Sequence, residues 1–273
     1  MKGHKDAIYD FVVDIENRTV YSAGAEGFVV KWNIDNPENG ELVLQGGEAF
    51  YSIWKNGDSL QLGSRSGKIY TVDLANTKLS HTEQVHTGGV FFIRDGLSGG
   101  EDGVLMDGIR KTKVAYKSLR CIVENKNRMF VGSSDANIYA IDRDIRGEVQ
   151  ILEGHINSVF ALEMLDENTL VSTGRDAHIR AWDLTMGKEV HAVPAHDYQA
   201  KSLSWNGSLL LSSSMDKTIK IWNAELELLK VIDFARYDGH TNCINKVQWI
   251  DENMFVSCSD DRTLCLWKVE IMP

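Results

Sequence analysis

The stretch VSTGRDAHIRAWDL, residues 171–184, places Ser172, Asp176 and His178 within seven consecutive residues. Serine, histidine and aspartate together form the catalytic group of many hydrolases, in which the serine attacks and the histidine takes its proton. The stretch therefore allows two interpretations, an active site or a piece of scaffold. The elements that hold these residues decide between them.

The pattern of this stretch recurs along the chain. Copies at 21–34, 211–224 and 256–269 also run from a serine through a small turn to an alternating strand that ends in tryptophan. Three weaker copies lack that tryptophan and carry Val72, Gly108 and Ile141 in its place. The seven copies recur about every 39 residues, a period typical of repeat folds.

Other alternating segments surround each copy, such as 7–14 before the first and 113–117 after the third. Glycine, asparagine and aspartate separate them, and no run of twelve or more residues has a clean helical period. The chain therefore reads as all-β, with four short strands in each unit. A single small sheet cannot bury both of its faces, but a closed ring of sheets can. We expect a seven-bladed β-propeller of four-stranded antiparallel blades in one domain, residues 1–273, with six or eight blades if a weak repeat is miscounted.

Gly-His pairs precede three of the repeats, at 3–4, 154–155 and 239–240, and Trp182-Asp183 ends the fifth. With a period near 40 residues, this signature resembles the WD40-repeat family. The resemblance covers the whole chain and is strong in repeats 1, 5, 6 and 7, whereas repeats 2 to 4 are degenerate. It implies a rigid ring that presents a binding face to protein partners.

The resemblance also assigns the polar residues of the opening stretch to a structural tetrad that clips each blade. The expected tetrads are His155, Ser172, Asp176 and Trp182; His196, Ser212, Asp216 and Trp222; and His240, Ser257, Asp261 and Trp267. Repeat 1 has His4, Ser22 and Trp32 with Glu26 in place of aspartate, and repeat 3 keeps His86, Ser98 and Asp102. An active site has no reason to recur in four blades, so we expect no catalytic residue, no metal site and no cofactor.

The seventh blade is expected to lack its outermost strand. The first Gly-His begins at residue 3, and the chain stops just after the third strand of the last repeat. Three interpretations follow: a three-stranded blade closed by packing between blade faces, which we favour, a truncated chain, or completion by a strand from a partner.

A partner face is expected where the loops enter the first strand of each blade. Five residues after each histidine position stand Tyr9, Tyr51, Phe91, Arg120, Phe160, Lys201 and Asn245. Arg65 and Arg175 stand just before the tetrad aspartate position of their repeats. Aromatic residues and arginine anchor interfaces, and arginine binds carboxylates and phosphates well. We predict a face for an acidic or phosphorylated segment, formed by all of these residues except Asn245. The alternative is that they fill the channel mouth or pair with Glu101 and Asp260.

The composition narrows the class of partner. The 273 residues carry a net charge of −10, which disfavours general binding to nucleic acids. The four cysteines form no CxxC pair, and we expect them to be reduced. Neither a signal peptide nor an apolar run of membrane-spanning length is present, which predicts a cytoplasmic protein, with the nucleus as the alternative location.

The sequence as a whole predicts a non-catalytic scaffold that binds a protein or peptide, not a membrane. One alternative is a structural subunit of a larger complex, docked through the incomplete seventh blade. The other is an enzyme with a pocket in the central channel.

Overall fold

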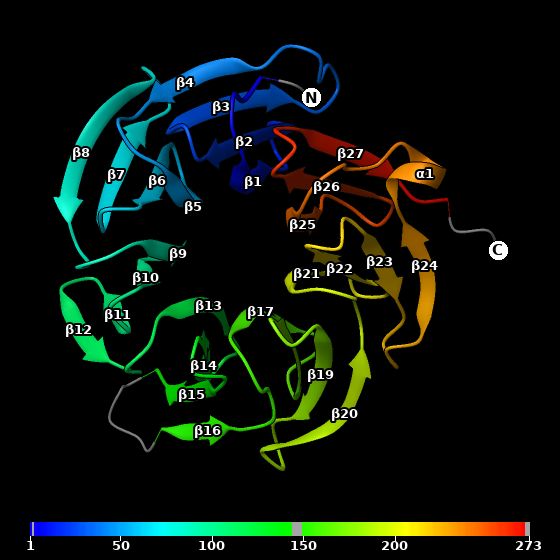
Figure 1. Ribbon diagram of the computed structural model, residues 1–273. Helices are drawn as coiled ribbons and strands as arrows, with labels where there is room; N and C mark the ends of the chain where they lie inside the picture. Colours follow the sequence, from blue (N-terminus) through cyan, green and yellow to red (C-terminus); the bar gives the residue numbers. More distant parts are fainter. Residues whose placement is uncertain (2, 144–148, 271–273) are drawn as a thin grey trace.

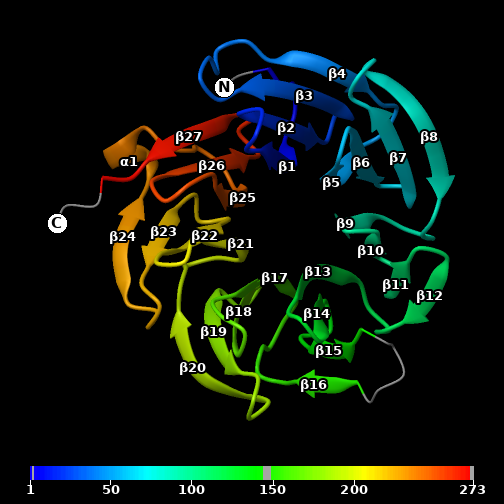
Figure 2. The same cartoon turned by 180° about the vertical axis from the view of Figure 1, so that it is seen from behind.

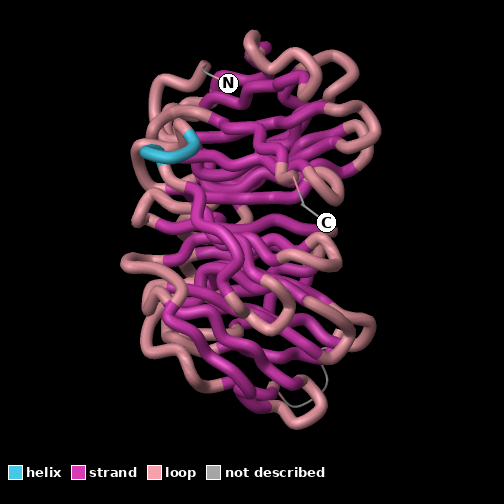
Figure 3. The backbone as a smooth tube through the Cα atoms, turned by 90° about the vertical axis from the view of Figure 1, so that its right-hand side faces the viewer, coloured by secondary structure: helices cyan, strands magenta, loops and turns pink. Residues whose placement is uncertain are grey.

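The computed structural model describes residues 1, 3–143 and 149–270. In that part of the chain, seven antiparallel sheets form a closed ring (Figure 1), and the innermost strands of neighbouring sheets contact one another all the way round. Each sheet follows the order of the sequence, with its first strand innermost. Figure 2 shows the ring from the opposite face, and Figure 3 shows from the side that the loops form its two faces. The predicted seven-bladed β-propeller is therefore confirmed.

The first four blades each contain four strands. Blade 1 contains β1 (Ile8–Asp14), β2 (Thr19–Gly24), β3 (Phe28–Asn33) and β4 (Glu41–Gln45). Blade 2 contains β5 (Phe50–Asn56), β6 (Ser59–Ser64), β7 (Lys68–Asp73) and β8 (Lys78–Gln84). Blade 3 contains β9 (Val90–Arg94), β10 (Leu97–Gly100), β11 (Val104–Asp107) and β12 (Arg110–Lys113). Blade 4 contains β13 (Leu119–Glu124), β14 (Arg128–Ser133), β15 (Ile138–Asp142) and β16 (Gln150–Leu152).

The last three blades include the one exception to the four-stranded pattern. Blade 5 contains β17 (Val159–Met164), β18 (Thr169–Gly174), β19 (His178–Asp183) and β20 (Lys188–Pro194). Blade 6 contains β21 (Ala200–Trp205), β22 (Leu210–Ser214), β23 (Ile219–Trp222) and β24 (Leu228–Ile232). Blade 7 contains β25 (Ile244–Trp249), β26 (Met254–Ser259) and β27 (Leu264–Lys268). A short helix, α1 (Phe234–Tyr237), lies between β24 and β25.

The hydrophobic core lies between neighbouring blades rather than inside any one of them. The second strand of a blade is almost wholly buried, as in β2, whereas the outermost strand is exposed, as in β8. Apolar clusters join adjacent blades because each sheet has two apolar faces. The described residues contain no helix with the length and apolar character that crossing a membrane requires.

Blade 7 has three strands in the described part of the chain, as the sequence predicts, and it packs face to face with blade 1. Phe11 and Leu264 belong to one buried cluster across this boundary. The Lys246 ammonium also lies 2.6 Å from an Asp10 carboxylate oxygen. The backbone of Met1 exchanges two hydrogen bonds with Leu264, of 3.0 and 3.3 Å. Face packing and this short backbone contact therefore join blade 7 to blade 1.

Blade 3 departs from the sequence prediction. Gly108, expected in strand position in place of a tryptophan, instead lies in the turn between β11 and β12. Its φ of 56° is in the left-handed region that glycine adopts without strain. The chain therefore reverses earlier than in blade 1, and the fourth strand occupies Arg110–Lys113 rather than the predicted 113–117.

Candidate functional site

Seven side chains meet at one mouth of the channel because each occupies the same irregularity of its innermost strand. The second residue of every innermost strand is skipped where the pairing register shifts. A β-bulge of this kind aims its extra side chain out of the ladder. All seven line a channel of about 840 Å³: Tyr9, Tyr51, Phe91, Arg120, Phe160, Lys201 and Asn245.

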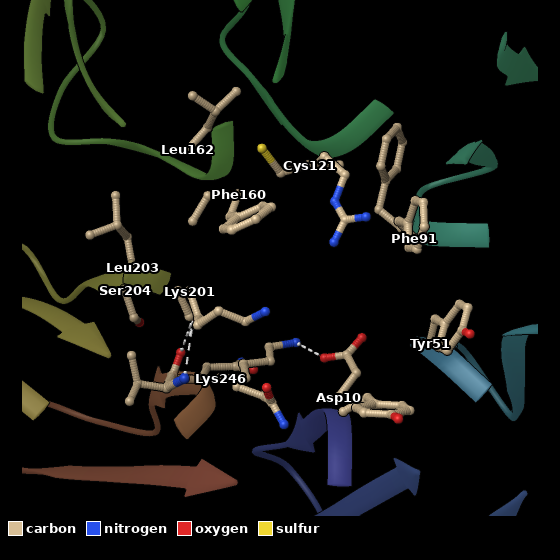
Figure 4. Close-up of a pocket in the computed structure, with 18 of the residues that line it drawn as sticks. Asp10, Tyr51, Phe91, Cys121, Phe160, Leu162, Lys201, Leu203, Ser204 and Lys246 are labelled. Atoms are coloured by element: carbon tan, nitrogen blue, oxygen red, sulfur yellow. Dashed lines mark hydrogen bonds and ion pairs between the residues drawn. The ribbon is translucent and has the colours of Figure 1, made fainter. Parts of the chain in front are cut away.

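The first six of these side chains contact one another in blade order, and we call them the mouth belt. The rings of Tyr9 and Tyr51 meet edge to face at 5.6 Å, and Tyr51 stacks on Phe91 at 5.6 Å. The Arg120 guanidinium lies 3.9 Å from the centre of the Phe91 ring and 5.1 Å from that of Phe160. The Lys201 ammonium lies 4.9 Å from the Phe160 ring. Figure 4 shows the labelled members of the belt around one shared space.

The two cations of the mouth belt are poorly hydrated. Burial lowers the pKa of both Arg120 and Lys201 from their ordinary values. The charge of Arg120 lowers the pKa of Lys201 further. Two like charges that face one cavity, held against aromatic rings instead of carboxylates, favour an anionic ligand between them.

The neighbouring carboxylates are engaged elsewhere. The Asn245 side-chain amide donates to Asp260 at 2.7 Å and to the carbonyl of Ile8 at 2.9 Å. A Glu101 oxygen accepts from the backbone N–H of Gly89 at 3.3 Å. Within the described residues, neither carboxylate forms an ion pair with a cation of the mouth belt. The predicted alternative, in which these acids neutralise the cations, therefore rests on no direct contact. It rests only on charge interactions, since Glu101 raises the pKa of Arg120 and Asp260 raises that of Lys201.

Arg65 and Arg175 lie at the rim of the mouth and not in the channel. Each donates its backbone N–H to the residue just before the innermost strand of its blade, Ala49 at 2.9 Å and Ser158 at 2.8 Å. This bond fixes the turn beside the mouth, while both side chains are exposed. In the ranges that the structure describes, neither guanidinium forms an ion pair. Both charges are therefore available to a ligand that extends beyond the channel.

The tetrads form buried hydrogen-bond networks. In blade 5, His155 lies 2.8 Å from Asp176 and 2.7 Å from the Ser172 hydroxyl, and the Trp182 indole donates to Ser172 at 2.8 Å. Blades 6 and 7 repeat this geometry with His196, Ser212, Asp216 and Trp222, and with His240, Ser257, Asp261 and Trp267. His4, Glu26, Ser22 and Trp32 do so in blade 1, and His86, Asp102 and Ser98 in blade 3.

This geometry leaves no room for catalysis by the serines. Ser172 is fully buried, and its hydroxyl is engaged by both the histidine and the indole. Burial alone would raise the pKa of Asp176, but the hydrogen bond with His155 lowers it to about 2. His178, the third polar residue of the opening stretch, contacts the backbone carbonyl of Asp176 instead of Ser172. A substrate carbonyl has no access to this site.

Two degenerate blades use a tyrosine as their clip, which sequence reasoning missed. In blade 2 the Tyr70 hydroxyl donates to Glu48 at 2.8 Å, and Glu48 also accepts from Ser66 at 2.8 Å. In blade 4 the Tyr139 hydroxyl donates to Asp135 at 2.8 Å. The signal that could have revealed them is the Ile-Tyr pair that both third strands share, in KIYTVD and IYAID.

The described residues offer few other groups that could bind a metal ion or react. They contain no group of three or more His, Cys, Asp or Glu side chains that could hold a metal ion. The four cysteines are free thiols. The channel mouth therefore remains the candidate functional site.

Comparisons with known proteins agree with this architecture. The family profile described as "WD domain, G-beta repeat" matches residues 146–183, 187–223 and 233–268. The chain is 24% identical over 169 residues to the guanine nucleotide-binding protein subunit beta-1 of Caenorhabditis briggsae, covering 60% of this chain and 50% of that protein. It is 25% identical over 177 residues to the ribosome biogenesis protein WDR12 homolog of Aedes aegypti, covering 55% and 41%. The chain thus spans half or less of the length of these relatives.

Solved structures share the fold. The WD40 β-propeller domain of Doa1 superposes with a TM-score of 0.85 at 21% identity, covering 99% of this chain and 95% of that one. The computationally designed Ika8 protein superposes with a TM-score of 0.73 at 20% identity, covering 98% of each chain. Three of the seven repeats therefore match the WD40 family model, and the chain as a whole has the fold of a seven-bladed β-propeller.

Proposed function

We propose that the chain is a non-catalytic interaction scaffold that binds a protein or peptide at the mouth belt and at the adjacent Arg65 and Arg175. The bound segment carries an acidic or phosphorylated side chain. The observation that carries this proposal is the position of Arg120, clamped between two aromatic rings at the channel mouth without a carboxylate partner among the described residues.

Two features of the site support an anionic ligand. Arg120 and Lys201 face one cavity on a protein whose net charge is −10, so the mouth differs in charge from the molecule as a whole. Arg65 and Arg175 extend the positive region to the rim. Binding at a partly buried cation costs less desolvation than at a fully hydrated one, because the cation has already lost water on folding.

The relatives support the wider class. One is named as a subunit of a guanine nucleotide-binding protein and another as a ribosome biogenesis protein. Such names describe proteins that work with others, and we extend to this chain only the general role of a scaffold.

The test compares two triple variants of equal charge. The face variant replaces Arg65, Arg120 and Arg175 by Gln, and the control replaces Lys78, Lys111 and Lys188, which are exposed on outermost strands. Affinity purification with quantitative mass spectrometry should recover specific partners with wild type and control and lose them with the face variant. Identical partners for all three proteins would reject the proposal. Binding should also weaken as the salt concentration rises.

A second candidate role uses the outer edge of blade 7, through which the chain would dock as a structural subunit. In the described part of the chain, Leu264 is the only residue of β27 with a backbone partner on that edge, namely Met1. Free N–H and C=O groups on a sheet edge accept an added strand.

The geometry of β27 supplies a clean test of this second role. The backbone N–H of Leu264 points away from β26, toward the outer edge of the blade. Because the direction of the N–H alternates along a strand, the N–H of Leu266, two residues further on, points the same way. Leu266→Pro removes the outward N–H but leaves the ladder to β26 intact, whereas Leu266→Ala keeps that N–H. Assembly into a larger complex, measured by size-exclusion chromatography of cell extract, should be lost only with proline. Equal assembly of both variants rejects this role.

The proposal includes a cytoplasmic site of action. Microscopy of the fluorescently tagged chain tests it, and a signal confined to the nucleus would reject it.

A further inference from the structure

Three neighbouring blades expose large apolar side chains on the face of the channel mouth. Tyr116, Ile156 and Tyr198 stand in the loops that enter blades 4, 5 and 6, and their exposed fractions are 98%, 83% and 63%. The corresponding positions of the other four blades hold polar residues or glycine: Lys5, Asp6, Gly47, Glu48, Thr87, Gly88, Thr241 and Asn242. The apolar surface is thus confined to one sector of the ring.

Hydrogen bonds hold these exposed residues beside the turns that flank the channel. The backbone N–H of Ile156 donates to Asp176 at 3.3 Å, next to Arg175. The Ser214 hydroxyl donates to the carbonyl of Tyr198 at 3.2 Å, next to Met215. Met215 is 47% exposed and also lines the channel. In blade 6 the apolar surface therefore runs from the rim into the mouth.

The same sector holds three of the four cations of the site, whereas the fourth, Arg65, belongs to blade 2. Arg120, Arg175 and Lys201 belong to blades 4, 5 and 6, in the same order as the three exposed apolar residues. The acids Asp6, Glu101 and Asp260 belong to blades 1, 3 and 7. Two exposed carboxylates, Glu153 and Asp197, lie within the sector, in the loops that enter blades 5 and 6. The face is therefore basic and apolar on one side and more acidic on the other.

We propose that blades 4 to 6 form a docking sector for a protein segment in which an acidic side chain stands close in sequence to a bulky apolar one. The acidic group enters the mouth beside Arg120 and Lys201, and the apolar side chain packs on Ile156 and Tyr198. Tyrosine and arginine at the centre of such a surface are typical of binding hot spots. This inference rests on the proposed function and adds the orientation of the partner and the second half of its recognition motif.

The experiment selects ligands from a display library of short random peptides on the immobilised protein. The sector variant carries Ile156→Ser and Tyr198→Ser. The control carries Leu79→Ser and Leu229→Ser, which are exposed at 46% and 54% on the outermost strands β8 and β24. Peptides enriched on wild type are synthesised with a fluorescent label, and fluorescence anisotropy gives their dissociation constants for all three proteins.

We expect wild type and control to enrich peptides that pair Asp or Glu with an aromatic or large aliphatic residue. The sector variant should bind these peptides about tenfold more weakly, a change of about 1.4 kcal/mol, and retain its preference for acidic residues. Acidic peptides with no apolar neighbour, or equal affinities for wild type and sector variant, would overturn this inference alone. Enrichment of peptides without any acidic residue would overturn the proposed function as well.

Discussion

Blade 7 has only three strands in the described part of the chain, which predicts that two equivalent tryptophans differ in their contribution to stability. Trp182 and Trp267 make the same hydrogen bond to the tetrad serine, at 2.8 and 2.7 Å. Trp182 is 1% exposed and lies against Gly154, where even an added Cβ would come within 2.9 Å of the indole. Trp267 is only partly buried. The pair therefore isolates the effect of the missing strand.

Replacing either residue by alanine removes the same indole and the same hydrogen bond. In blade 5 the change leaves an enclosed cavity, and a buried Trp→Ala substitution costs about 4 kcal/mol. In blade 7 part of the ring already contacts water, so less burial is lost, and we expect a cost of about 2 kcal/mol for Trp267→Ala.

Urea denaturation followed by far-ultraviolet circular dichroism measures both free energies of unfolding, since the signal comes from the strands and not from tryptophan. Equal losses in the two variants, or a larger loss for Trp267→Ala, would refute the reasoning, because they would mean that β27 is covered in solution.

Two further predictions concern buried oxygens. Burial raises the pKa of Glu163, which lines the channel, to about 7 from an ordinary 4.5. The folded protein therefore holds this proton more tightly than the unfolded chain does. The free energy of unfolding should fall as the pH rises between these two values. Glu163→Gln should raise the free energy of unfolding at alkaline pH by up to about 3 kcal/mol and leave it unchanged at acid pH. The control, Glu83→Gln on the exposed strand β8, should change the free energy of unfolding at neither pH. Tyr70→Phe should cost about 1.5 kcal/mol in urea denaturation because Glu48 loses a hydrogen-bond donor, and the 98% exposed Tyr116 supplies the control Tyr116→Phe. An unchanged pH profile for the first, or an unchanged urea midpoint for the second, would contradict these assignments.

The repeat pattern makes the fold predictable from the sequence, because every blade needs apolar residues at the same buried positions. Counting five residues from the histidine positions locates the whole mouth belt, including Arg120 in a blade whose tetrad has decayed. The alignment also places Arg65 and Arg175 in turns beside the mouth, and the structure has them at its rim rather than among the residues that line the channel. The residue before the tetrad aspartate lies in a turn fixed by its own N–H, and that geometry sends the side chain to the rim.

The bulges, the tyrosine clips and the early turn of blade 3 depend on contacts between different segments of the chain, which the pattern of one segment does not show. A β-bulge is a property of two paired strands, so the pattern of one strand gives no sign of it. The tyrosine clips of blades 2 and 4 escaped notice because hydroxyl and carboxylate come from positions that the tetrad pattern does not use together. The early turn of blade 3 depends on Gly108, whose conformation the repeat alignment does not reveal.

The bulges also explain how one ring can carry a specific surface without losing stability. The residue just before each bulge is an apolar side chain that is at most 1% exposed: Ile8, Phe50, Val90, Leu119, Val159, Ala200 and Ile244. The bulge residue itself makes no ladder pair, so its type is free of the packing that its neighbour must satisfy. The seven blades accordingly place tyrosine, phenylalanine, arginine, lysine and asparagine at one geometric position. Because the ladder and the core constrain this position so little, its residue type differs from blade to blade while the ring keeps one fold.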